Sequence, residues 1–141
     1  MEKIEYDKEG LEALIFTAEG DMRYALNNLQ ATFSGFGYVS KDNVFKVCDQ
    51  PHPDLINKVI DDCMGSNFES ACDRIDVIVH EGYNMMDIVG NLTKLTQIKE
   101  MDEMKRLVYL KILAEFKMRV LEGMDSHLQL HGVLAKLCTS I

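Results

Sequence analysis

The sequence predicts an all-α protein in two helical parts. Apolar residues recur at helical spacing along nearly the whole chain, and no segment shows the alternation of apolar and polar residues typical of a strand. The two prolines stand together at Pro51 and Pro53, where their rings push the preceding residues out of helical space. We therefore expect about eight helices, with one part over residues 1–50 and a second over residues 51–141.

Three helices are expected in the first part. Asp7 can cap a helix that ends near Gly20, Asp21 can cap the next, and Ser40 can start a short third one. The second of these helices has apolar residues at helical spacing, which we expect to be buried. They are Met22, Ala25, Leu26, Leu29 and Phe33.

Five helices are expected in the second part. The first covers residues 55–65, and the next two start at Asn67 and Asn84, which can cap them. The longest helix covers residues 102–122, and Ser126 begins the last one.

The predicted 102–122 helix is apolar around most of its circumference, so it must be covered on more than one side. Neighbouring helices of its own bundle could cover it, or part of its surface could meet another subunit. The candidates for such a subunit interface are Leu107, Leu110, Leu113, Phe116 and Val120.

Composition and charge exclude several classes of protein. The 141 residues carry a net charge of −8, and each of the two parts contributes −4, which disfavours bulk binding of nucleic acid. No apolar run approaches the length of a membrane span, so we expect no membrane partner. The first residues are charged rather than apolar, which argues against a secretion signal and for a reducing environment. The four cysteines lack CxxC pairing and are expected to be buried free thiols.

Known catalytic patterns are missing from the sequence. It has no GxxxxGK[ST] phosphate loop, GxGxxG, HExxH or GxSxG segment. His127 and His131 have a spacing that could chelate zinc in a helical enzyme, but no third ligand accompanies them, and we interpret them as a pair on a helix surface. We expect no catalytic residue, metal or cofactor in this chain by itself.

Residues 94–119 form the one locally basic stretch, with seven basic against four acidic side chains. Two interpretations remain open: a solvated or ion-paired helix face, and a weak contact with phosphate.

Arg23 has an unusual position, in the first turn of a predicted helix, where the helix dipole disfavours a cation. Asn27 and Gln30 lie on the same polar face. A guanidinium at a helix start can bind a phosphate oxygen, although Arg23 could equally be a surface arginine paired with Asp21 or Glu19.

The segment Gly20-Asp21-Met22-Arg23-Tyr24-Ala25-Leu26-Asn27-Asn28-Leu29-Gln30 resembles the GDxRxAxNxLQ segment of clamp-loader AAA+ ATPases. Residues 9–15 and 45–53 extend the similarity, which covers nearly the whole chain and is greatest to the small subunits of eukaryotic replication factor C. The resemblance implies a partial AAA+ lid domain over residues 1–50 and a helical collar domain over residues 51–141.

Several roles follow from this resemblance. Arg23 would be the sensor-2 arginine that reaches the γ-phosphate of ATP, supported by Gly20, Asp21 and Asn27, and the 102–122 helix would pack between collar domains. The implied partners are the other clamp-loader subunits and, through the full nuclear complex, the sliding clamp and primer–template DNA.

The sequence departs from the family pattern because it lacks the nucleotide-binding core. We therefore expect ATP and Mg²⁺ to belong to a longer parent protein, of which this chain resembles the carboxyl-terminal part. An unrelated all-helical adaptor or oligomerisation module would explain the helices equally well, but it would not explain the segment from Gly20 to Gln30.

Overall fold

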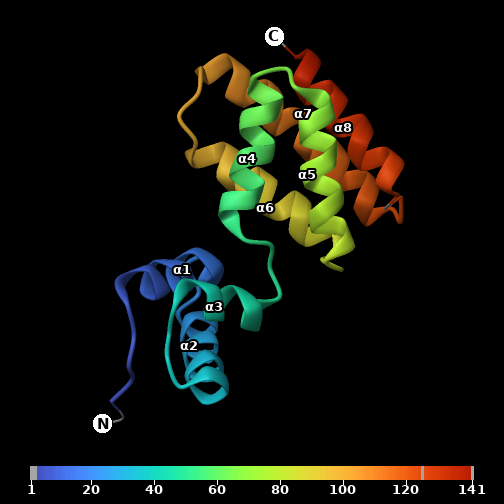
Figure 1. Ribbon diagram of the computed structural model, residues 1–141. Helices are drawn as coiled ribbons and strands as arrows, with labels where there is room; N and C mark the ends of the chain where they lie inside the picture. The colour runs from blue at the N-terminus through green and yellow to red at the C-terminus, as the bar shows by residue number, and fades with distance from the viewer. Residues whose placement is uncertain (1–2, 125, 141) are drawn as a thin grey trace. The chain divides into compact units, whose positions relative to one another are not determined.

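The computed structural model describes residues 3–124 and 126–140, and these residues form eight α-helices with no strand. The predicted all-α fold class is confirmed. The chain divides into two compact units, residues 1–52 and residues 53–141 (Figure 1), which are described separately below.

Unit 1 is formed by α1 (Lys8–Ala18), α2 (Met22–Phe36) and α3 (Lys41–Cys48). Each helix starts where the sequence predicts, because the side chains of Asp7, Asp21 and Ser40 accept hydrogen bonds from backbone N–H groups of the first turn. The helices enclose a small apolar core. Its buried members are Ala13, Leu14, Val39, Val44 and Phe45.

The amino-terminal segment is fixed to the loop before α3. The backbone N–H of Val39 donates to the carbonyl of Glu5 at 2.9 Å, and the carbonyl of Val39 accepts from the N–H of Asp7 at 3.1 Å. Gly10 lies against this bridge, and a Cβ added there would stand 2.3 Å from the Val39 carbonyl oxygen. This close approach of two backbones requires glycine at position 10.

The prediction of a buried stripe on α2 is wrong in its N-terminal half. The side chains of Met22 and Leu26 are 72% and 56% exposed, whereas Asn28 and Thr32 are buried. Within unit 1, α2 contacts α1 and α3, which cover the side of α2 that carries Asn28 and Thr32. The hydroxyl of Thr32 donates to the carbonyl of Asn28 at 2.7 Å, so the buried Thr32 hydroxyl has a hydrogen-bond partner.

Unit 2 is a five-helix bundle. Its helices are α4 (Pro53–Met64), α5 (Phe68–His80), α6 (Met85–Ile98), α7 (Glu103–Leu121) and α8 (His127–Thr139). Helix α4 packs against α5, α6 and α8, and α7 packs against α6 and α8 (Figure 1). Across the described residues, no helix is both long and apolar enough to cross a membrane.

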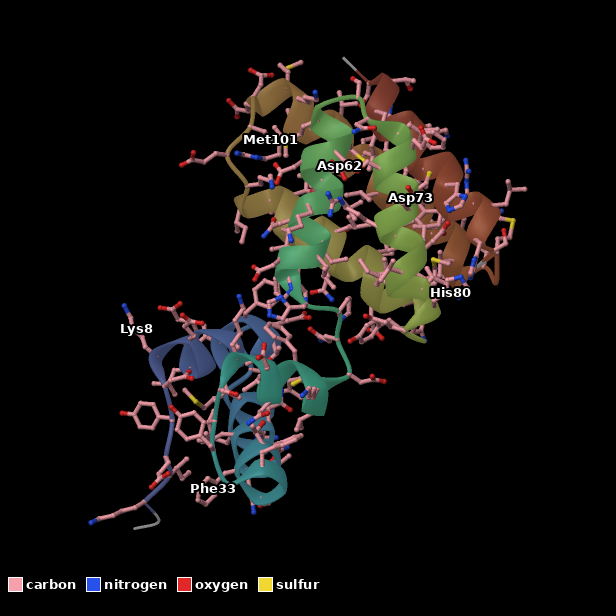
Figure 2. All side chains as sticks on the ribbon, in the orientation of Figure 1. Lys8, Phe33, Asp62, Asp73, His80 and Met101 are labelled. Carbon is pink, nitrogen blue, oxygen red and sulfur yellow. The ribbon has the colours of Figure 1, made fainter. Side chains whose placement is uncertain are left out.

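The α4–α5 pair is joined by a polar contact above an apolar core. Asp62 on α4 lies beside α5 (Figure 2), and its carboxylate accepts from Ser70 Oγ at 2.9 Å and from Arg74 Nε at 2.6 Å. Beneath it, Ile60, Cys63 and Ile75 are almost completely buried. The α4–α5 pair is therefore held by a polar contact at its surface and by apolar packing inside.

Candidate functional site

Helix α7 contributes one face to the core of unit 2. Its first turn is capped by Asp102, whose carboxylate accepts from the backbone N–H of Lys105 at 3.1 Å. Four side chains at spacings of four, three and four residues are buried against α6 and α8. They are Tyr109, Leu113, Phe116 and Val120.

The other side of α7 carries a second row of residues, which we call the α7 stripe. It consists of Met104, Leu107, Lys111, Ala114, Met118 and Leu121, all of them exposed. Its four large apolar side chains are 56–70% exposed. The spacings alternate between three and four residues, which is the heptad spacing of helices that pack against another helix. The α7 stripe is thus an apolar surface that the other helices of unit 2 leave exposed.

This geometry corrects the predicted set of interface candidates. Leu113, Phe116 and Val120 are 0%, 2% and 8% exposed, so the bundle itself covers them and they cannot present surface to another subunit. Leu110 is half-buried, and Leu107 alone of the five is exposed. The prediction treated every apolar residue of the helix alike, although one row of them packs inside the unit.

The sequence did contain the signal for the missed residues. Met104, Met118 and Leu121 continue the heptad spacing that passes through Leu107, while the buried row follows a separate register on the opposite side. A helix with two apolar registers can be divided into two faces from sequence, but which face is internal depends on the neighbouring helices.

Several basic side chains of residues 94–119 form contacts within unit 2. Lys99 Nζ lies 2.8 Å from Asp61 Oδ1, Lys105 Nζ donates to the carbonyl of Met64 at 3.3 Å, and Arg106 Nη2 donates to the carbonyl of Lys99 at 2.8 Å. Lys99 is therefore ion-paired, whereas Lys105 and Arg106 are held by hydrogen bonds to backbone carbonyls. The exposed side chains of Lys111, Lys117 and Arg119 on α7 form no ion pair with any residue that the structure describes.

Arg23 lies in the first turn of α2 with its side chain exposed. Asp21 Oδ1 accepts from the backbone N–H of Arg23 at 2.8 Å and of Tyr24 at 3.5 Å, so these N–H groups are already occupied. A phosphate near this helix start would therefore meet the guanidinium rather than these two N–H groups. No ion pair joins the guanidinium to Asp21 among the residues that the structure describes.

The residues predicted to support Arg23 surround it on the surface of unit 1. Gly20 has φ of +85°, which lets the chain turn from α1 into α2 without strain. Asp21 caps α2, and Asn27 lies exposed one turn after Arg23. An apolar groove of about 640 Å³ lies further along α2, between Ile4, Leu26 and Phe33. Unit 1 thus carries an exposed guanidinium and an open apolar groove on the same helix.

The two histidines of α8 differ in their surroundings. His131 Nε2 lies 2.7 Å from Asp76 Oδ1, so His131 joins α8 to α5, while His127 is exposed. No group of three His, Cys, Asp or Glu side chains within residues 3–124 and 126–140 could hold a metal ion. His131 therefore takes part in a contact between two helices of unit 2.

All four cysteines are free thiols, as the sequence predicts, but only two of them are fully buried. Cys63 and Cys138 lie in the interior of unit 2, and Cys48 and Cys72 are half-buried. Burial raises the pKa of Cys63, and the neighbouring Cys138 raises it further. A thiol held in its protonated form is a poor nucleophile, which fits a structural role.

Comparison with known proteins assigns the helical bundle to a family. Residues 51–136, nearly all of unit 2, match the family described as Replication factor C C-terminal domain. This bundle is therefore of the kind found at the carboxyl-terminal end of replication factor C proteins. The chain belongs to the replication factor C family, and the resemblance seen in its sequence is confirmed.

Individual relatives extend the similarity to unit 1. Replication factor C subunit 2 of Arabidopsis thaliana is 48% identical over 96% of this chain and 41% of its own length. Replication factor C subunit 4 of Saccharomyces cerevisiae is 43% identical over 97% of this chain and 42% of its own. A replication factor C small subunit of the archaeon Staphylothermus marinus is 35% identical over 96% of this chain. The chain spans about two fifths of the length of these relatives.

Proposed function

We propose that this chain serves as the assembly and nucleotide-coupling part of a clamp-loader subunit. Unit 2 would be the collar domain that joins the subunit to its neighbours, and unit 1 would be part of the lid. The family match over residues 51–136 supports the first role, and the exposed Arg23 at the start of α2 supports the second.

The exposed α7 stripe is the observation that carries the assembly role. A stripe of this length leaves several large apolar side chains in water, at a cost of about 25 cal/mol for each Å² that a partner would otherwise cover. Lys111 lies in the middle of the stripe, and a charged residue within an apolar seam selects a partner that carries an acidic group opposite it. The expected partner is a helix of another clamp-loader subunit with apolar residues at heptad spacing and a carboxylate facing Lys111.

In the nucleotide-coupling role, Arg23 would contact the γ-phosphate of an ATP molecule that the rest of the subunit binds. The sequence of this chain contains no GxxxxGK[ST] phosphate loop. ATP and Mg²⁺ would therefore bind elsewhere in a longer protein, and the chain alone would not hydrolyse ATP. An exposed guanidinium on a capped, rigid helix is suited to report whether a γ-phosphate is present.

In this proposal the complete complex would load the sliding clamp onto primer–template DNA in the nucleus. The chain itself would contribute little to DNA binding, because its net charge of −8 repels a phosphate backbone. Contact with clamp and DNA would pass through the other parts of the complex.

Capture of partner subunits tests this function. The tagged chain is co-expressed with the other clamp-loader subunits, and the captured subunits are quantified for the wild type and for the double variant Leu107→Asp/Met118→Asp. The control, Val77→Asp/Ile98→Asp, places the same charges at exposed apolar positions on α5 and α6.

We expect the wild type and the control to capture the partner subunits and the stripe variant to lose most of that capture. If the stripe variant captures as well as the control does, the α7 stripe is not the contact surface. If the wild type captures none of the subunits, the assembly role itself is contradicted.

A further inference from the structure

A second surface of unit 2 has the features of a peptide site, and it is distinct from the α7 stripe. A groove of about 130 Å³ lies between α7 and α8. Its floor is apolar, formed by Ile112, Phe116 and Val133, and Arg119 and Lys136 stand at its edge. Pockets for cofactors and drug-sized molecules measure roughly 300–1,000 Å³, so this groove has room for a single side chain of a larger partner.

Gly132 on α8 contributes empty space to this groove. A glycine in a helix interior costs about 1 kcal/mol relative to alanine. Some helical glycines are required because a neighbour comes too close, as at Gly10, but nothing lies within 4 Å of a Cβ added at Gly132. Gly35 and Gly90 are equally open, so Gly132 shows only that the groove has room for a partner group beside α8.

The charges at the groove edge are unbalanced. Arg119 and Lys136 are exposed, and neither forms an ion pair with any residue that the structure describes. Glu115 is the acidic side chain of the lining, one turn before Arg119 on α7, and it does not pair with Arg119. Two cations beside an apolar floor are complementary to carboxylates beside an apolar side chain.

We propose that the groove between α7 and α8 binds an acidic peptide segment of a partner protein, with one apolar side chain inserted over Gly132 and carboxylates paired with Arg119 and Lys136. The groove is lined by residues of α7 other than those of the stripe. This site goes beyond the assembly role and does not depend on it.

Fluorescence polarisation with the full chain tests the site. The probe is a labelled peptide composed of Asp, Glu and Leu, and the reference is a peptide of equal length in which Lys replaces each acidic residue. We expect the acidic peptide to bind and the basic peptide not to bind. Added salt should weaken the binding, because the pairing charges are exposed.

Four variants assign the binding to the groove. Arg119→Glu and Lys136→Glu should each lower the affinity for the acidic peptide by about fivefold. A loss of this size corresponds to one exposed ion pair. Gly132→Leu should remove binding by filling the groove, and its fold is checked by circular dichroism. Glu115→Gln should strengthen binding, because it removes the repelling charge.

The matched control is Lys117→Glu, which makes the same change of charge on α7 outside the groove. The proposal is overturned if Lys117→Glu weakens binding as much as Lys136→Glu, if the basic peptide binds equally well, or if neither peptide binds. It is also overturned if the wild type self-associates in sedimentation and Gly132→Leu abolishes that association, because the occupant would then be a second copy of the chain. Should Gly132→Leu fail to fold, the three charge variants still decide the question.

Discussion

Leu107 and Phe116 lie on opposite sides of the same helix. They are nine residues apart, or about two and a half helical turns. Phe116 is 2% exposed in the core of unit 2, whereas Leu107 is 56% exposed. Helix α7 therefore has two apolar faces, one buried in the core of the bundle and one exposed.

The two faces should respond differently to truncation. Leu113→Ala opens a cavity in the core and should lower the free energy of unfolding by about 3 kcal/mol. Leu107→Ala removes an exposed side chain and should change it by less than about 0.5 kcal/mol. Urea unfolding followed by circular dichroism measures both variants. Equal destabilisation by the two would contradict the assignment of faces.

Unit 1 should be sensitive to a single methyl group at position 10. Gly10→Ala forces a Cβ against the Val39 carbonyl and should destabilise unit 1 by about 2 kcal/mol, despite the better helix propensity of alanine. Hydrogen exchange of the Val39 amide, which donates to Glu5, reports this opening. Gly35→Ala is the control, because nothing lies within 4 Å of its Cβ. A protected Val39 amide in Gly10→Ala would refute the close approach.

Stability should fall at alkaline pH. In the unfolded chain a cysteine loses its proton near pH 8.5, but burial raises the pKa of Cys63 in the folded chain. Above that pH the unfolded state therefore binds fewer protons than the folded state does. The free energy of unfolding then decreases by about 1.4 kcal/mol per pH unit for this thiol. Cys63→Ala should make the decrease shallower between about pH 8.5 and pH 10. Val59→Ala, a truncation at an equally buried position without an ionisable group, should leave the slope unchanged.

Arg23 should matter for ATP turnover and not for assembly. In the complete subunit within its complex, Arg23→Ala should lower DNA-stimulated ATPase activity by at least about tenfold, because a charge that stabilises the γ-phosphate is lost. Lys8→Ala removes an exposed cation on α1 and serves as the control. Unchanged turnover in Arg23→Ala, with the complex intact, would make Arg23 an ordinary surface residue.

The helices could be predicted from the sequence because their signals are local. The three helices of unit 1 begin at the predicted capping residues, Asp7, Asp21 and Ser40. A capping side chain bonds to a backbone N–H only two or three residues further along, so the local sequence is enough to predict it. Family membership was equally visible, because the residues from Gly20 to Gln30 form a continuous pattern.

The buried face of each helix could not be predicted from the sequence, because burial depends on which helices are its neighbours in the fold. Met22 and Leu26 have the spacing of a core stripe, yet both are exposed, whereas Leu29 and Phe33 further along the same stripe pack against the core of unit 1. No sequence pattern predicts the groove at Gly132, because its residues come from α7 and α8 and only the fold brings them together.

The most direct test of the central claim is the oxidation of Met104 and Met118 by hydroxyl radicals. Both lie in the α7 stripe and are 69% and 63% exposed in the free chain, so both should oxidise readily there. When the chain is assembled with the other clamp-loader subunits, we expect both methionines to become protected, as a helix packed along the stripe would require. Oxidation at the same rate in the free and assembled chain would contradict the claim that the α7 stripe is a subunit contact.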